Sequence, residues 1–237
     1  MITSLENKTV KQLTRLHQKK YRTERFLLLD EELIKEAANS GCLEQLVYTG
    51  EKPFSFSDEL EVSKEVLNKI AGRQGLRYIG VSRMIEESPI NGNRIVILDR
   101  LQDPLNIGRI MEACRLFGFE TMILSENCAD IYNEKCLDKC KGVIYTLKIR
   151  HGDILEEIKK LQDDGYLVCA TGLRKNTKEL HEVKAAEKMA FILGNEGSGV
   201  RSEVMDGADE IIKIDMCNID SLNVGMAAAI IMYQFRI

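Results

Sequence analysis

Short apolar segments alternate with segments of helical periodicity from Arg94 to the end of the chain. Buried strands that alternate with helices form a mostly parallel sheet with helices on both faces. A helix is expected at Ile154–Gln162, and strands at Ile95–Leu98, Thr121–Leu124, Val143–Leu147, Tyr166–Ala170 and Ala190–Leu193. The pattern therefore predicts an α/β domain, whose ligands would bind where the strands end.

A smaller α/β unit is expected before this domain. Strands are predicted at Phe26–Asp30, Leu46–Thr49 and Tyr78–Ser82, and helices at Glu31–Asn39 and Ser63–Ala71. The segment Glu86–Asn93 contains turn formers and few apolar residues, which is typical of a linker. We therefore divide the chain into domains of residues 1–90 and 91–237.

Composition favours a soluble cytoplasmic protein. Of the 237 residues, 44% are hydrophobic and 30% are charged, as in ordinary globular proteins. No apolar run approaches the roughly 18 residues of a membrane span, so no membrane partner is expected. The N-terminus lacks the apolar core of a signal peptide, and an odd count of seven cysteines indicates reduced thiols.

The formal net charge of −4 hides a basic segment in residues 1–26. Only Glu6 and Glu24 oppose seven basic residues, with Tyr21 among them. The basic residues are Lys8, Lys11, Arg15, Lys19, Lys20, Arg22 and Arg25. Such a segment suits phosphate binding, and it also fits a solvated amphipathic helix that turns Val10, Leu13 and Leu16 inward. One helix can satisfy both interpretations.

Two loops near the C-terminus suit a bound cofactor. In FILGNEGSGV a buried strand stops at Leu193, and the glycines at 194, 197 and 199 leave backbone N–H groups accessible to a ligand. In IDMCNIDSLNVGMAAAIIMYQ, Asp220 or Ser221 is the expected N-cap of an apolar helix, near Asn223. Together the two loops predict a cofactor pocket built from strand ends.

A third segment, LDRLQDPLNIGRIMEACRLFGF, begins at Leu98. Here Asp103 and Pro104 should end the strand, Asn106 and Gly108 should form a tight turn, and a helix should run to Gly118. This segment resembles the first motif of the SpoU/TrmH branch of the SPOUT methyltransferases. The GNEGSGV loop is similar to the second motif of that family, and IDMCNIDSLNVGMAAAI to the third. The residues before the linker are similar to a ribosomal-protein-like RNA-binding domain.

The resemblance implies a trefoil-knotted α/β fold, S-adenosylmethionine as cofactor, a homodimer, and methylation of a ribose 2′-hydroxyl in structured RNA. Ribosomal RNA is the expected substrate, and transfer RNA is an alternative. The last helix supports an interface independently, because its apolar residues leave no solvated face and must be buried against the domain or a second subunit. These residues are Val224, Met226, Ala227, Ile230, Ile231 and Tyr233.

The resemblance also assigns site residues. It places Asn106, Ser221 and Asn223 at the target nucleotide or in the catalytic geometry, and it implies no metal. Glu196 is expected to order the turn in which it lies. The cofactor would lie against Leu193, Gly194, Asn195, Glu196, Gly197, Gly199, Ile214, Met216 and Leu222.

One position departs from the family pattern. Six residues after Asn106 the family has an arginine, supposed to act near the ribose and its phosphate, whereas this chain has Glu112. Arg109 and Arg115 lie three residues to either side, so either could supply the cation and pair with Glu112. Three interpretations stay open: a substituted but active site, a non-catalytic RNA-binding relative, and Glu112 as a general base.

Other chemistries fit less well. GNEGSG has its glycines in the wrong order for a dinucleotide-binding loop, and no Lys-Ser/Thr pair follows as a P-loop requires. Cys136 and Cys140 lie four residues apart on an expected helix, with Cys128 before them and His151 after. Metal binding is conceivable there, but we expect thiols packed as small apolar groups.

Overall fold

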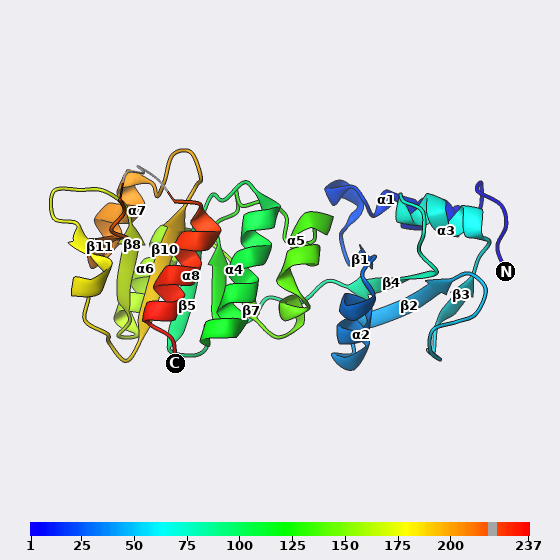
Figure 1. The fold of residues 1–237 in the computed structure, drawn as a ribbon, viewed down its shortest axis with the longest axis horizontal. Coiled ribbons are helices and arrows are strands. Elements are labelled where there is room, and N and C mark those ends of the chain that lie inside the picture. Colours follow the sequence, from blue (N-terminus) through cyan, green and yellow to red (C-terminus); the bar gives the residue numbers. More distant parts are fainter. Residues whose placement is uncertain (218–221) are drawn as a thin grey trace. The chain divides into compact units, whose positions relative to one another are not determined.

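The computed structural model describes residues 1–217 and 222–237 and separates the chain into two compact units (Figure 1). The first unit comprises Met1–Glu86 together with Tyr132–Tyr145, and the second comprises Glu87–Ile131 together with Thr146–Ile237. The sequence division at residue 90 thus differs from the contacts for one segment, since Tyr132–Tyr145 packs with the first unit. Among the described residues, no helix is long and apolar enough to cross a membrane.

The first unit is built on a four-stranded sheet in the order β1-β4-β2-β3. The pairings of β4 with its neighbours are antiparallel, and β2 pairs with β3 in parallel. The strands are β1 Arg25–Leu28, β2 Leu43–Tyr48, β3 Glu59–Glu61 and β4 Tyr78–Arg83. Helices α1 (Lys8–Arg15) and α3 (Lys64–Ala71) pack together, and their apolar residues share a core with alternate strand residues. Val10 and Leu13 of α1 lie in this core, as the amphipathic pattern predicts.

Helix α2 (Glu31–Asn39) and the segment Tyr132–Tyr145 also belong to this unit. The rings of Phe26 and Tyr132 lie 4.7 Å apart, and the Tyr145 hydroxyl donates a hydrogen bond to Ser82 Oγ at 3.0 Å. Within the segment, α5 is Glu134–Cys140 and a 3₁₀ turn, η2, is Val143–Tyr145. The predicted strand Val143–Leu147 is therefore wrong.

The physical reason for that error lies in two residues. Lys141 and Gly142 adopt positive φ angles of 49° and 77°, which end α5 and turn the chain before η2. Strand β7 starts only at Lys148, after this turn.

Cys136 and Cys140 of α5 are fully buried, as packed thiols would be. Among the described residues, no group of three or more His, Cys, Asp or Glu side chains could hold a metal ion.

The second unit contains the predicted parallel sheet. Its strand order is β7-β6-β5-β10-β8-β11-β9, and every pairing between these strands is parallel. The strands are β5 Arg94–Asp99, β6 Thr121–Leu124, β7 Lys148–His151, β8 Leu167–Thr171, β9 Lys178–Glu179, β10 Met189–Gly194 and β11 Glu210–Lys213. The sequence did not predict β9 and β11, which are short and form one edge of the sheet.

Helices cover both faces of this sheet (Figure 1). Helices α4 (Pro104–Phe117) and α8 (Val224–Gln234) lie side by side on one face. On the other face, α6 (Ile154–Asp163) and α7 (Ser202–Gly207) share a buried cluster with alternate residues of β5, β8 and β10. The rings of Phe191 in β10 and Phe235 after α8 stack at 4.9 Å. Because the strands are parallel, the carboxyl ends of β5, β10 and β11 all lie along the same edge of the sheet, the one at which its strands end.

Candidate active site

The loop after β10 is a tight turn that its own side chain holds. Asn195 and Gly199 exchange backbone hydrogen bonds of 3.1 and 2.8 Å. The Asn195 side-chain oxygen accepts from the backbone N–H groups of Gly197 and Ser198 at 3.0 and 3.1 Å, while its amide donates to the Arg100 carbonyl at 2.9 Å. Asn195 therefore shapes this loop and ties it to the end of β5.

Two glycines in this loop have different surroundings. A Cβ at Gly194 would lie 2.1 Å from the Val200 nitrogen, so the loop can return past the end of β10 only if residue 194 is glycine. Gly197 has open space, since a Cβ added there would have as its nearest neighbour the Asn195 side-chain oxygen, 3.6 Å away. The loop is thus closed at its base and accessible at its tip.

Glu196 connects this loop to the start of α4. Its carboxylate accepts hydrogen bonds from the backbone N–H groups of Gln102 and Asp103 at 3.2 and 3.3 Å, and from the Asn106 amide at 3.1 Å. Burial raises the pKa of Glu196, but hydrogen bonds from its own backbone, Asn106, Gln102 and Asp103 outweigh burial and leave the pKa lowered. The Glu196 carboxylate thus accepts from its own backbone N–H, as expected of a group that orders its turn, and it also binds the neighbouring loop.

Asn106 is the centre of the arrangement. It is only 3% exposed, and its side-chain oxygen accepts a hydrogen bond from the Asn223 amide at 3.1 Å. The Asn223 oxygen in turn accepts from the N–H groups of Gly225 and Met226 at 3.0 and 3.4 Å. The hydrogen bonds from Asn106 to Glu196 and from Asn223 to Asn106, here called the asparagine link, therefore join three segments that are about 90 and 117 residues apart in sequence.

Two local predictions at these segments are wrong. Asp103 caps α4 and Pro104 begins it, so Asn106 and Gly108 lie inside the helix rather than in a tight turn. The N-cap of α8 is Asn223, whose side chain meets the first free N–H groups, rather than Asp220 or Ser221. The predicted site residue Ser221 lies outside the described residues.

An ion pair between a buried aspartate and a partly exposed arginine lies beside the loop, and the sequence did not predict it. Asp99, at the end of β5, is fully buried and accepts from the Arg201 backbone N–H at 3.0 Å and from Arg201 Nε at 2.9 Å. Arg100 follows with a φ of 60°, and its Nε lies 3.8 Å from Asp99. An aspartate that ends an otherwise apolar strand was the available signal. This pair fixes where the loop rejoins the sheet before α7.

The three charged candidates on α4 differ in their surroundings. Arg109 is exposed, and its aliphatic stem lies beside Gly225 at the start of α8, 3.5 Å from a Cβ built there. Glu112 is half-buried and Arg115 is exposed. Among the described residues, Arg109 makes no ion pair with Glu112, while Arg115 has an interaction partner, so a pairing of Glu112 with Arg115 stays a prediction. Arg109 lies one helical turn from Asn106 and is thus the cation nearest to the asparagine link along α4.

The remaining residues predicted to bind the cofactor lie at or after the ends of β10 and β11 or before α8. Leu193 is buried in β10, where Gly194 pairs in register with Asp99 of β5. Ile214 and Met216 come after β11, which lies one strand away from β10 across β8. Leu222 precedes the α8 cap. Leu193 thus lies next to the end of β10, where Gly194 pairs with Asp99, and Leu222 directly precedes Asn223.

The basic residues predicted to bind RNA lie in the first unit. Lys8, Lys11 and Arg15 are on α1, Lys19 and Lys20 are on the 3₁₀ turn η1 (Lys19–Tyr21), and Arg25 begins β1. Most of their side chains are exposed, although Lys11 pairs with Glu6. Arg22 differs, because its guanidinium donates to the backbone carbonyls of Leu16 and His17 at 2.8 and 2.9 Å.

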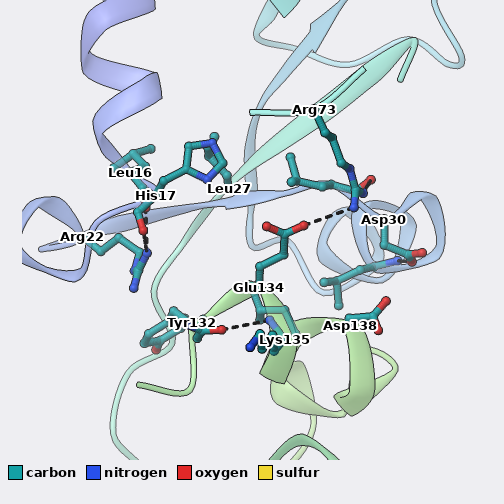
Figure 2. Close-up of a pocket in the computed structure, with 14 residues that line it drawn as sticks. Leu16, His17, Arg22, Leu27, Asp30, Arg73, Tyr132, Glu134, Lys135 and Asp138 are labelled. Carbon is teal, nitrogen blue, oxygen red and sulfur yellow. Dashed lines mark hydrogen bonds and ion pairs between the residues drawn. The ribbon is translucent and has the colours of Figure 1, made fainter. Parts of the chain in front are cut away.

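The first unit also contains a cavity of about 570 Å³, shown in Figure 2. Its floor is apolar, with Leu27 and Leu29 from β1 and its continuation. Arg73 reaches across it to Glu134 at 3.1 Å. Three cationic side chains face three carboxylates around the cavity: Arg22, Arg73 and Lys135, against Asp30, Glu134 and Asp138. This balance of charge does not favour a polyanion.

The comparisons with known proteins agree with this geometry. Residues 93–233 match the model of the SpoU rRNA Methylase family. The chain belongs to this family. The match contains all of the asparagine link and the loop after β10, so the residues that meet at the sheet edge are the SpoU segments. The α/β fold with a parallel-sheet methyltransferase core is thereby confirmed.

Known proteins are similar to this chain over almost its whole length. It is 28% identical to the 23S rRNA (guanosine(2553)-2′-O)-methyltransferase RlmP of Bacillus subtilis, with 99% of this chain and 98% of the relative covered. The crystal structure of an AdoMet-bound rRNA methyltransferase from Sinorhizobium meliloti is 25% identical, covers 98% of this chain and 95% of that one, and has a TM-score of 0.88. A structure of an RNA 2′-O ribose methyltransferase is 26% identical, with coverages of 98% and 96% and a TM-score of 0.81.

Proposed function

We propose that this protein transfers a methyl group from S-adenosylmethionine to a ribose 2′-hydroxyl of ribosomal RNA. The observation that carries the proposal is the Glu196–Asn106–Asn223 link, which brings polar side chains from three SpoU segments to one edge of the sheet. The RlmP relative, which is named for 2′-O-methylation of 23S rRNA, supports both the atom and the RNA class. Seven free cysteines agree with the cytoplasmic location that we propose.

The residues at the strand ends fit the proposed cofactor. Its adenosyl group needs apolar surface and backbone donors and acceptors, and Leu193, Ile214, Met216 and Leu222 supply side chains of that kind. Gly197 and Gly199 leave the tip of the loop free of side-chain bulk. The sulfonium of S-adenosylmethionine supplies an activated methyl group with a good leaving group. The protein then has to hold the ribose hydroxyl in line and handle its proton.

We assign the positioning to Asn106 and Asn223, with Ser221 as a further candidate from the sequence. The amide of Asn223 fixes the orientation of the Asn106 side chain, and Glu196 fixes it from the other side. A buried amide with both ends bound does not rotate, so the site has its geometry before RNA arrives. The same link places the start of α8 beside α4.

The cation that the family has six residues after Asn106 is supplied here, in our proposal, by Arg109. Its charged group is exposed, and its stem runs along Gly225 toward the start of α8. An arginine there can bind the phosphate next to the target ribose with two parallel hydrogen bonds. Arg115, about two turns further along α4, is the alternative cation, and Glu112, which lies between the two arginines, would act as a general base instead. A non-catalytic relative would not need a second arginine in place of the family arginine.

A homodimer is the proposed assembly. Helix α8 leaves Met226 and Tyr233 57% exposed and Ile230 40% exposed in the single chain, and Leu116 of the adjacent α4 is 69% exposed. Because these apolar residues are exposed in the single chain, the expectation that α8 has no solvated face requires a second subunit that covers them. A second copy that presents the same helices would satisfy this surface. The trefoil knot implied by the family resemblance belongs to the same proposal.

RNA would also contact the basic segment of the first unit. Lys8, Arg15, Lys19, Lys20 and Arg25 extend from exposed positions on α1, η1 and β1. These flexible cations can neutralise phosphates of any sequence, which gives affinity rather than selectivity. We propose that the first unit holds the RNA while the second performs the transfer.

The test combines binding and transfer. Calorimetric titration with S-adenosylmethionine should show one site per chain. Labelled methyl should pass to ribosomal RNA that lacks the modification, and the phosphodiester bond after the 2′-O-methylated ribose should then resist cleavage by alkali. Transfer to transfer RNA alone would replace the substrate class. If the original protein and the Glu112→Arg variant, which restores the family arginine, both bound the cofactor but methylated neither RNA, that result would support a non-catalytic relative. No binding of the cofactor would contradict the proposal as a whole.

A further inference from the structure

A second hollow in the first unit has a volume of about 310 Å³ and lies beside the basic segment. It is bounded by α1, by the chain between η1 and β1, and by Gln45 of β2. Tyr21 lines it and is 40% exposed, which is unusual for an aromatic ring that no apolar core requires. The other polar groups that line it include Gln12, Arg15, Thr23, Glu24 and Arg25. Its size suits one nucleotide rather than a duplex.

Two cations lie over the Tyr21 ring. The guanidinium carbon of Arg15 is 5.4 Å from the ring centroid, and the ammonium of Lys20 is 4.9 Å from it. Exposed cation–π contacts are weak, whereas stacking of a base on an aromatic ring is stronger and accepts any base. A base can therefore replace one of these cations over the ring. The displaced cation stays close enough to bind the phosphate of the same nucleotide.

The position of Tyr21 is fixed before any ligand binds. Its backbone N–H donates to the Gln18 carbonyl at 3.0 Å, which closes η1. The Arg22 guanidinium donates to the carbonyls of Leu16 and His17, and Figure 2 shows these residues gathered at one side of the larger cavity. His17 Nε2 lies 2.8 Å from the Ile70 carbonyl on α3. The turn is held from both sides, so little order has to be gained when a base stacks.

The two hollows of this unit differ in charge. The cavity of about 570 Å³ balances three cations with three carboxylates, whereas beside the smaller hollow Arg15, Lys20 and Arg25 outnumber the carboxylates of Glu24 and of Glu44, which pairs with Arg25 at 3.9 Å. A nucleotide brings one phosphate, so the smaller hollow has the complementary charge. The exposed amide of Gln12 can bind a base edge there. Neither feature requires a particular base.

We propose that Tyr21 is a stacking platform for one unpaired nucleotide of the substrate RNA, with Arg15, Lys20 and Arg25 around its phosphate. This inference rests on the proposed RNA substrate and names the form of RNA that the first unit recognises. Stacking needs a base outside a helix, so the platform selects a single-stranded loop, bulge or end. The lysines of the basic segment would add affinity on either side of it.

The chain has no tryptophan, which permits a direct test. In Tyr21→Trp the new indole is the sole tryptophan, and its fluorescence should fall when a short single-stranded oligoribonucleotide binds. The same oligonucleotide with one abasic position, and its duplex, should quench less. Tyr48→Trp is the matched control, because Tyr48 is half-exposed at the end of β2 that pairs with Tyr78 and should respond to neither RNA. Equal quenching by the abasic and intact strands would overturn the platform.

Affinity gives a second readout. Tyr21→Ala should weaken binding of the single-stranded oligonucleotide about tenfold, whereas Tyr21→Phe keeps the ring and should bind like the original. In methyl transfer, Tyr21→Ala should raise KM for RNA and leave kcat unchanged. Quenching without any methyl transfer would leave the platform standing and contradict the proposed enzyme. Transfer with unchanged RNA affinity in Tyr21→Ala would keep the enzyme and overturn the platform.

Discussion

The two units of this protein hold their polar side chains in opposite ways. In the second unit, Asn106 and Asp99 are almost or fully buried, and each is bound by partners from distant segments. In the first unit, Lys19, Lys20 and Tyr21 are exposed on a short turn. Buried polar groups must be fully bound and so keep one geometry, whereas exposed cations can adapt to a ligand. The exposed side chains of the first unit suit a surface that receives a flexible substrate, and the buried side chains of the second unit suit a reaction.

This difference predicts separable effects. Changes in the buried link should lower the rate of transfer, because they move groups that must be aligned. Changes in the exposed turn should lower RNA affinity and its dependence on salt, because they remove phosphate contacts. A substitution in either unit that had the effect expected of the other would contradict this division of roles.

The largest effect is expected from Gly194→Ala. The added Cβ would lie 2.1 Å from the Val200 nitrogen and 2.2 Å from the Gly199 carbonyl carbon, so the backbone of the loop must move. A displacement of about 1 Å can cost about a hundredfold in rate. Cofactor affinity by calorimetry and methyl transfer should both fall by at least that order.

Gly207→Ala is the control for this change. Gly207 is at the end of α7 in the same unit, and the nearest atoms to its Cβ are 3.8 Å away, an ordinary contact. Cofactor binding and transfer should match those of the original protein. If Gly194→Ala bound the cofactor normally, the tight base of the loop would have no part in the site.

Asn223→Ser should have the next largest effect. Serine caps a helix about as well as asparagine, so α8 keeps its N-cap. The Nδ2 donor to Asn106 is lost, however, and an unsatisfied buried acceptor costs about 1–3 kcal/mol. A loss near the lower end of this range, about 1.4 kcal/mol, would lower the transfer rate roughly tenfold. Single-turnover transfer and thermal melting would be measured on the same preparation.

Asn133→Ser provides the matched control, since Asn133 caps α5 in the first unit by accepting from the Lys135 N–H at 3.0 Å. Asn133→Ser should melt close to the original temperature, and Asn223→Ser only a few degrees lower, as expected for the loss of one buried hydrogen bond. A loss of transfer in Asn223→Ser that is matched by a large fall in its melting temperature would show that Asn223 stabilises α8 and does not position Asn106.

These residues also mark how far the sequence could predict the structure. Helix α2 was predicted with its observed bounds, and the strand Thr121–Leu124 likewise, because capping and apolar runs are local signals. The roles of polar residues were harder to predict. Glu196 binds residues more than 90 positions earlier, and Asp99 binds Arg201, so no local pattern contains either partner. Family resemblance gave Asn106 and Asn223 their roles in the site, but neither it nor the loop pattern around Asn223 predicted their contact.

A smaller effect is expected from the double variant Lys19→Ala, Lys20→Ala. Removal of two phosphate contacts should weaken RNA binding about fivefold near physiological salt and reduce the slope of log affinity against log salt by about 1.4. The rate of transfer at saturating RNA should not change. The control is Lys148→Ala with Lys159→Ala, which removes two exposed lysines from the second unit. An equal loss of affinity in the control would mean that RNA binds by net charge rather than through the turn.

The smallest effect concerns the pH dependence of the Glu196 link. Because the folded protein lowers the pKa of Glu196 from its ordinary value of 4.5, the ionised carboxylate stabilises the folded state. Its contribution should be complete above about pH 4.5 and should disappear as the pH falls through the lowered pKa. Melting temperatures of the original protein and Glu196→Gln should therefore differ by a constant amount at neutral pH and converge under acid. A difference that grew on acidification would mean that burial dominates and raises the pKa, and the hydrogen bonds from Asn106, Gln102 and Asp103 would then be weaker than their geometry indicates.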